Sequence, residues 1–157
     1  NRNRYFLTEF SGDWASEGHM KEQPLEFGKK ILDSKLGSRS NMFCSPFFQL
    51  SLDGKAEENQ GEILVGTLGW TGNFRFTFEI DNKNELRVIS GINPYASEYS
   101  LKPNEIFRTP DFYFTYSFSG KGQASRNFLG TKISGQRRRK KPYDLIKQLG
   151  SYILRFQ

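Results

Sequence analysis

Residues suited to catalysis are scarce in this sequence. It contains one histidine, His19, and one cysteine, Cys44. A cysteine beside a histidine can act as a nucleophile with its base, but no catalytic signature surrounds Cys44, and a lone cysteine is typically a small buried hydrophobic residue. One histidine also excludes a metal site built on several histidines. We therefore expect no metal ion, no cofactor and no cysteine–histidine pair.

The acidic residues do not form an evident acid–base pair either. General acid–base catalysis requires titratable groups that converge on one point, whereas most acidic residues occur in predicted turns. In turns, carboxylates are typically solvated or accept hydrogen bonds from the local backbone. We expect this role for Asp53, Glu57, Glu58, Asp81, Glu105 and Asp111.

Aromatic residues, which make up 15% of the chain, are the better candidates for a binding site. Trp14, Trp70, Tyr95 and Tyr99 could stack on the apolar face of a sugar ring, since flat aromatic faces pair with apolar surfaces. Packing in the hydrophobic core is the competing explanation for the same side chains. A free-standing carbohydrate-binding module requires them to be exposed and coplanar, and burial of all four would exclude it.

Two short motifs resemble sites for phosphate or nucleic acid. Residues 120–123, Gly-Lys-Gly-Gln, lack the Gly-Lys-Ser/Thr ending of a phosphate-binding loop, so we expect a turn there. Residues 137–141, Arg-Arg-Arg-Lys-Lys, have the composition of a nucleic-acid-binding patch. Runs of like charge are usually solvated, and binding through this one would weaken steeply with salt. We expect no nucleic-acid partner.

The charge distribution places a boundary near Phe128. The formal net charge is +6, yet residues 1–128 hold 15 basic and 16 acidic residues. Residues 129–157 hold 8 basic residues and one acidic residue, Asp144. The sequence therefore predicts a nearly neutral domain over residues 1–128 and a basic tail over residues 129–157.

The elements that would position these side chains are short strands. The 157 residues, 36% of them hydrophobic, suffice for one domain with a core. Aromatic residues together with 15 Gly and 6 Pro favour strands and turns over helices. Residues 14–28 are mostly polar and contain Pro24, so we predict an irregular segment there. We predict an all-β antiparallel sandwich with a short irregular or helical basic tail, and strands at residues 5–10, 29–36, 47–52, 63–70, 74–80, 86–92 and 112–116.

The sequence also limits where the protein acts. No run of about 18 apolar residues is present, so we expect no membrane partner and favour a cytoplasmic location. A single cysteine excludes a disulfide-stapled scaffold. The chain begins with Asn1 and no signal-like segment follows, which indicates an internal or processed piece of a longer protein.

An ordered series of motifs goes beyond composition. It spans residues 5–128 and resembles the N-terminal domain of glycoside hydrolase family 36 α-galactosidases. The matching motifs are Ser-Gly-Asp-Trp at 11–14, Leu-Gly-Ser-Arg-Ser at 36–40, Ser-Pro-Phe at 45–47, Glu-Glu-Asn-Gln-Gly-Glu at 57–62, Trp-Thr-Gly-Asn-Phe at 70–74, Ser-Gly-Ile-Asn-Pro-Tyr at 90–95, Leu-Lys-Pro-Asn-Glu at 101–105 and Thr-Pro at 109–110. Residues 15–19 depart from the Arg-Glu-Arg pattern usual in that family.

The resemblance implies a parent enzyme that hydrolyses terminal α-galactosides of the raffinose and melibiose type with retention. In that family two aspartates, with carboxyls about 5–5.5 Å apart, lie in a (β/α)₈ barrel of about 250 residues. That barrel does not fit after Phe128, so we carry over no catalytic residue and expect this chain to be inactive alone. The resemblance further implies a partial β-supersandwich, incomplete at its start, that supports the barrel and a homotetramer.

The basic tail departs from the family. Lys-Gln-Leu-Gly at residues 147–150 stands where family members have Asn-x-Trp-Glu at the first barrel strand. If one extra adenine precedes the assumed codons AAC-AGT-TGG-GAA for Asn-Ser-Trp-Glu, the reading frame shifts by one base. The shifted codons AAA-CAG-TTG-GGA then encode Lys-Gln-Leu-Gly. We therefore hypothesise that the tail from Leu129 is translated out of frame, which would also explain its basic composition.

Overall fold

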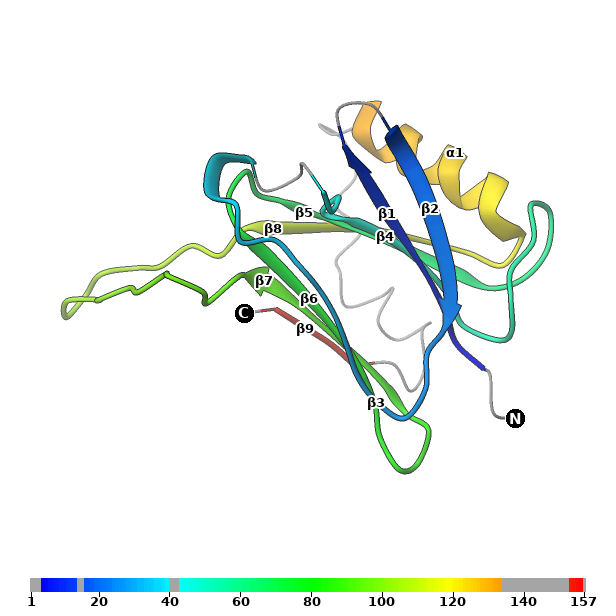
Figure 1. The fold of residues 1–157 in the computed structure, drawn as a ribbon, viewed down its shortest axis with the longest axis horizontal. Helices are drawn as coiled ribbons and strands as arrows, with labels where there is room; N and C mark the ends of the chain where they lie inside the picture. Colours follow the sequence, from blue (N-terminus) through cyan, green and yellow to red (C-terminus); the bar gives the residue numbers. More distant parts are fainter. Residues whose placement is uncertain (1–3, 14–15, 40–42, 134–152, 157) are drawn as a thin grey trace.

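The computed structural model of this chain describes residues 4–13, 16–39, 43–133 and 153–156. Its elements form two β-sheets and one α-helix (Figure 1). One sheet has the order β2-β1-β4-β5-β8 and the other has the order β3-β6-β7-β9. The elements are β1 (Phe6–Asp13), β2 (Ser16–Pro24), β3 (Gly28–Asp33), the 3-10 turn η1 (Gly37–Arg39), β4 (Phe47–Ser51), β5 (Ile63–Gly69), β6 (Phe74–Ile80), β7 (Leu86–Ile92), β8 (Asp111–Ser117), α1 (Gly120–Ile133) and β9 (Ile153–Phe156).

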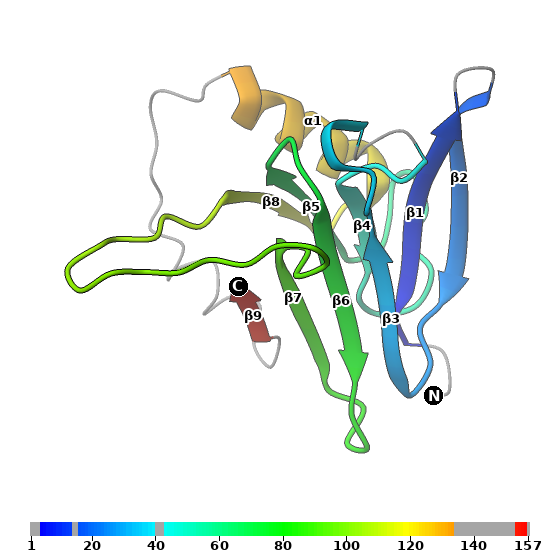
Figure 2. The same cartoon turned by 60° about the vertical axis from the view of Figure 1, so that its left-hand side comes forward.

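The molecule has three layers. The two sheets face each other, and α1 lies over the outer face of the five-stranded sheet (Figures 1 and 2). Among the described strands, neighbouring pairs are antiparallel except β7 with β9, which is parallel. The predicted antiparallel β-sandwich is therefore confirmed.

Strand β6 shows why the sheets pack as they do. Phe74, Phe76 and Phe78 are buried, whereas the residues between them are only half-buried, because successive side chains point to opposite faces of a strand. The ring of Phe48 on β4 meets them from the other sheet, 5.2 Å from the Phe76 ring and 4.9 Å from the Phe78 ring. Edge-on aromatic contacts of this kind close the main core.

A helix was expected only as one alternative for the basic tail from Leu129, whereas α1 already begins at Gly120. The turn expected at residues 120–123 is wrong, because this segment forms the first helical turn. The loop before β5 supplies acceptors for it: the Lys121 amide donates to the Glu57 carbonyl at 2.8 Å, and the Gly122 amide donates to the Glu58 carbonyl at 2.9 Å. These contacts satisfy N–H groups that a helix start otherwise leaves open. A small second core lies under the helix, formed by Ala56, Ile63, Val65, Ala124, Phe47 and Phe128.

Strand β2 corrects the prediction of an irregular segment at residues 14–28. It pairs with β1 in register from Phe6 opposite Pro24 to Ser11 opposite His19. Polar residues are tolerated because β2 is an edge strand. Pro24 lies at the last position of this edge strand, where a missing N–H costs no ladder hydrogen bond.

The predicted tail contains regular structure at both ends. Helix α1 runs to Ile133, across the boundary expected near Phe128, and Ile153–Phe156 form β9, a strand that was not predicted. The basic run at 137–141 and the Lys-Gln-Leu-Gly motif at 147–150 lie outside the described residues. In the described part of the chain, α1 is too short and too polar to cross a membrane.

Candidate functional site

The most distinctive surface feature is the connection between β7 and β8. Residues 94–110, which we call the arm, project away from the sandwich as two extended limbs (Figures 1 and 2). A turn closes the tip, where the Glu105 amide donates to the Lys102 carbonyl at 3.0 Å and the Lys102 amide donates to a Glu105 carboxylate oxygen at 2.9 Å. A connection of this length without helix or strand is usually functional in compact domains.

The arm carries apolar side chains that the sandwich does not cover. Ile106 is 93% exposed, Tyr95 is 56% exposed and Tyr99 is 55% exposed. The rings of Tyr99 and Phe107 lie 4.9 Å apart and join the two limbs. Leu101 is exposed as well. Exposed apolar side chains gathered on one segment make the arm the candidate interaction surface of the described residues.

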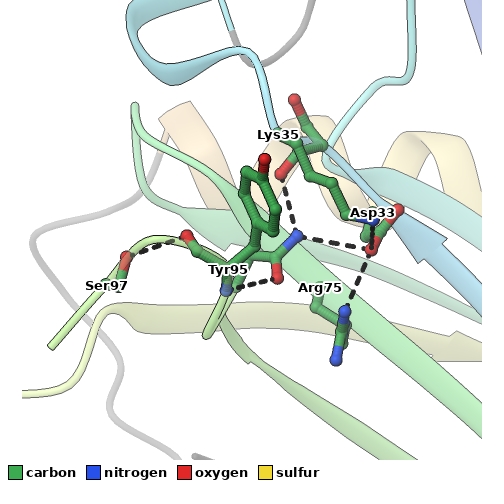
Figure 3. Close-up of polar contacts among 7 residues, drawn as sticks. Asp33, Lys35, Arg75, Tyr95 and Ser97 are labelled. Carbon is green, nitrogen blue, oxygen red and sulfur yellow. Dashed lines mark hydrogen bonds and ion pairs between the residues drawn. The ribbon is translucent and has the colours of Figure 1, made fainter.

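A buried asparagine fixes the base of the arm. Asn93 is fully buried, and its Nδ2 donates to the Ser34 carbonyl at 3.0 Å and to Asp33 Oδ2 at 3.3 Å (Figure 3). Its Oδ1 accepts a hydrogen bond from the Tyr95 amide at 3.0 Å. One side chain therefore links the end of β3 to the first residues of the arm.

Asp33 is the centre of this cluster. Its Oδ2 accepts from Arg75 Nη2 at 3.2 Å and lies 3.9 Å from Lys35 Nζ (Figure 3). Lys35 Nζ in turn lies 5.3 Å from the centre of the Tyr95 ring, a cation–π distance. Two hydrogen-bond donors, Arg75 and Asn93, and the Lys35 ammonium therefore meet at Asp33, which links the end of β3 to the base of the arm.

The structure describes three of the four aromatic residues considered for sugar stacking. Trp14 lies outside the described residues. Trp70 follows β5 and is 37% exposed, with Gly72 directly beneath its indole. Tyr95 lies at the base of the arm, and Tyr99 packs on Phe107 farther out. The three described residues are exposed, so core packing does not explain them.

The other candidate residues have ordinary roles. Burial is the main reason that the pKa of Cys44 rises to about 11, so its thiol is not a nucleophile at neutral pH. His19 is exposed on β2. Asp81 Oδ1 accepts hydrogen bonds from the amides of Lys83 and Glu85, the turn role expected for it. No three His, Cys, Asp or Glu side chains cluster as metal ligands within the described ranges.

Sequence reasoning missed the residues that hold the arm. Asp33, Arg75 and Asn93 come from three different strands or strand ends, so their spacing gave no signal. The available hint was the Asn-Pro pair directly after β7, because a polar residue before proline typically begins a turn.

Comparisons with known proteins give a consistent result. The family model for the glycosyl hydrolase family 36 N-terminal domain matches residues 1–102. Alpha-galactosidase 2 of Hypocrea jecorina is 33% identical over 122 residues, which are 78% of this chain and 16% of that protein. Alpha-galactosidase AgaA of Geobacillus stearothermophilus is 32% identical over 124 residues, 79% of this chain and 17% of that protein.

Solved structures agree with these matches. The α-galactosidase of Lactobacillus brevis superposes with a TM-score of 0.68 at 28% identity, covering 85% of this chain and 17% of that one. The family 36 α-galactosidase AgaB of Geobacillus stearothermophilus gives a TM-score of 0.70 at 32% identity, covering 75% of this chain and 16% of that one. The chain thus spans about one sixth of the length of the proteins it matches.

Proposed function

We infer, from the premise that this chain belongs to the glycosyl hydrolase family 36 N-terminal domains, that it acts as the non-catalytic N-terminal domain of a retaining α-galactosidase. The observation that carries this proposal is the family match over residues 1–102. The substrates we propose for the whole enzyme are terminal α-galactosides of the raffinose and melibiose type. A cytoplasmic location is part of the proposal, and fractionation of the producing cells tests it.

The partners we propose are a catalytic barrel and, through it, a homotetramer. The arm offers the surface for such a contact, because Ile106, Tyr99 and Leu101 are exposed on it. Apolar side chains gain free energy when a second surface removes them from water. The hydrogen bonds of Asn93 hold the arm in place before any contact forms, which lowers the entropy cost of docking.

A carbohydrate-binding module is the second candidate. The exposure of Trp70, Tyr95 and Tyr99 supports it, because burial would have removed these rings from any sugar. Lys35 covers part of the Tyr95 ring, which leaves less aromatic face for a pyranose.

A chimeric enzyme tests the first proposal. In this chimera the complete chain replaces the matched region of AgaA of Geobacillus stearothermophilus, and hydrolysis of nitrophenyl α-galactoside is measured. We expect hydrolysis by the chimera and none by the chain alone. A folded chimera without activity would contradict a supporting role.

Calorimetric titration of the complete chain with raffinose and melibiose tests the second candidate. A carbohydrate-binding module predicts binding that Tyr95→Ala or Trp70→Ala weakens, with Phe27→Ala, an exposed aromatic residue outside the candidate set, as the control. The absence of binding would exclude the module and leave the first proposal intact.

A further inference from the structure

The helix α1 lies over the outer face of the five-stranded sheet and covers a small core of its own (Figure 2). Its four buried members are Ala56, Ile63, Val65 and Ala124, whereas the main core between the sheets has fifteen among the described residues. Two of the four are alanines, so little apolar area is buried under the helix. Because the free energy of burial scales with apolar area, α1 is held less strongly than the two sheets hold each other.

The first turn of α1 is where the helix is attached to the sandwich by hydrogen bonds. The Gly120 amide donates to the Gly61 carbonyl at 3.0 Å, and the Lys121 amide donates to the Glu57 carbonyl at 2.8 Å. Lys121 Nζ also lies 2.8 Å from Glu22 Oε1 on β2. These contacts fix the end of the helix at which the chain arrives from β8.

Gly120 allows this attachment and is also the point about which the helix can turn. Its φ is +75°, a conformation that residues with side chains rarely adopt. A Cβ at this position would lie 2.5 Å from the Glu57 carbonyl oxygen and 2.6 Å from the Gln60 nitrogen, both of which are backbone atoms. Any larger residue would therefore push the start of α1 away from the loop.

The helix has little stability apart from the sheet. Three of its 14 residues are glycine, which destabilises a helix relative to alanine. Isolated helices of this length are marginal in water even when their sequence is favourable. The backbone hydrogen bonds of α1 should therefore break when the helix leaves the sheet, which makes its amides reporters of that opening.

We propose that α1 is a cap that opens as a separate unit about Gly120 while the two sheets stay intact. Opening uncovers Ile63 and Val65 on the outer face of the five-stranded sheet. Proteins open in such sub-global units, and a unit with few buried apolar contacts opens most often. The inference does not depend on the proposed α-galactosidase role.

Native-state hydrogen exchange in the complete chain tests the cap. We expect the amides of α1 to exchange through an opening at least about tenfold more frequent than the opening that exposes β6. Gly120→Ala should accelerate exchange in α1 by about a further tenfold, because alanine disfavours a positive φ, and should leave β6 and β7 unchanged.

Two other glycines of the same helix supply a graded comparison. At Gly122 a Cβ would meet the Glu58 carboxylate, which can swing away, so Gly122→Ala should accelerate exchange less than Gly120→Ala. At Gly130 a Cβ would have no described atom within 4 Å. Gly130→Ala is therefore the matched control, and it should slow exchange in α1 by about fourfold through its higher helix propensity.

Exchange in β6 and β7 shows whether each variant keeps its sheets, and Gly122→Ala decides the question if Gly120→Ala does not fold. Faster exchange in α1 than in β6, with a further increase confined to α1 in a folded glycine variant, is the expected result. The proposal is overturned if α1 and β6 of the native chain exchange through the same opening, or if no folded variant at Gly120 or Gly122 accelerates α1 relative to β6.

Discussion

The β6 strand and the arm contain the same kinds of residue and use them in opposite ways. In β6, Phe74 and Phe76 are fully buried between the sheets. In the arm, Tyr99 and Ile106 are more than half exposed, although the arm lies only one strand further along the chain. Apolar side chains in β6 thus stabilise the fold, whereas those of the arm stay exposed and form the surface that we propose for contact with the rest of the enzyme.

The junction between these regions explains how the arm keeps its position without a core of its own. Asn93 ends the buried region and donates hydrogen bonds to Ser34 and Asp33. Polar contacts therefore fix the direction of the arm, and apolar side chains remain free to make its contacts. Three predictions test this division and a fourth, on Glu22, tests the attachment of α1; they run from the largest expected effect to the smallest.

Phe76→Ala should lower the free energy of unfolding by about 3–5 kcal/mol, because it leaves a cavity between the sheets. Phe107→Ala, the same substitution in the arm, should change it by less than about 1 kcal/mol, since Phe107 is 39% exposed and belongs to neither hydrophobic core. Urea denaturation measures both values. Equal losses would contradict the contrast between β6 and the arm.

Asn93→Ala should cost about 1–3 kcal/mol, because the Tyr95 amide and the Ser34 carbonyl lose a buried partner. The matched control is Ser97→Ala, which removes a long, exposed hydrogen bond to the Tyr95 carbonyl and should have almost no effect. Hydrogen exchange in residues 95–100 should rise in Asn93→Ala alone. Unaltered exchange there would mean that Asn93 does not hold the arm.

The sequence predicted the buried region well and the junction poorly. Strands at residues 74–80 and 86–92 are confirmed as β6 and β7, because strict alternation follows directly from burial on one face. The start of helix α1 escaped prediction because its first turn contains Gly120 and Gly122, which favour turns, and contacts with the loop at Glu57 and Glu58 override that preference.

The candidate site could be predicted only in part. Tyr95 and Tyr99 were identified by residue type, and the structure shows them exposed on the arm. Their anchors, Asp33 and Asn93, are 60 residues apart in the sequence and meet only through the order of strands in the sheet. Local sequence patterns contain no information about such a contact.

The third prediction concerns Glu22 on β2, a residue outside the arm. Its contact with Lys121 joins α1 to the five-stranded sheet. Partial burial alone would raise the pKa of Glu22, but hydrogen bonds from Lys121 at 2.8 Å and Lys55 at 2.6 Å outweigh it and lower this pKa. The resulting stability is present above the ordinary carboxylate pKa and is lost as pH falls through that range toward the lowered value. We expect a loss of at most about 1 kcal/mol, as for a partly exposed ion pair.

Thermal unfolding between pH 7 and pH 3 measures this effect. Glu22→Gln should flatten the pH dependence relative to the native chain, since the titrating group is gone. Glu105→Gln is the control, because Glu105 lies at the arm tip. An equal pH dependence in the native chain and in Glu22→Gln would show that the contacts with Lys55 and Lys121 do not stabilise the fold.

The fourth prediction has the smallest expected effect on stability and concerns the arm itself. It is also the most direct test of the proposal that the arm docks on the rest of the enzyme. The double variant Ile106→Ser with Phe107→Ser is compared with the native chain, both alone and in the chimera with AgaA. We predict that the free energy of unfolding of the chain alone changes by less than about 1 kcal/mol, while the chimera loses hydrolysis of nitrophenyl α-galactoside. Full activity in a chimera that carries both substitutions would contradict the claim that the arm exists to dock on the rest of the enzyme.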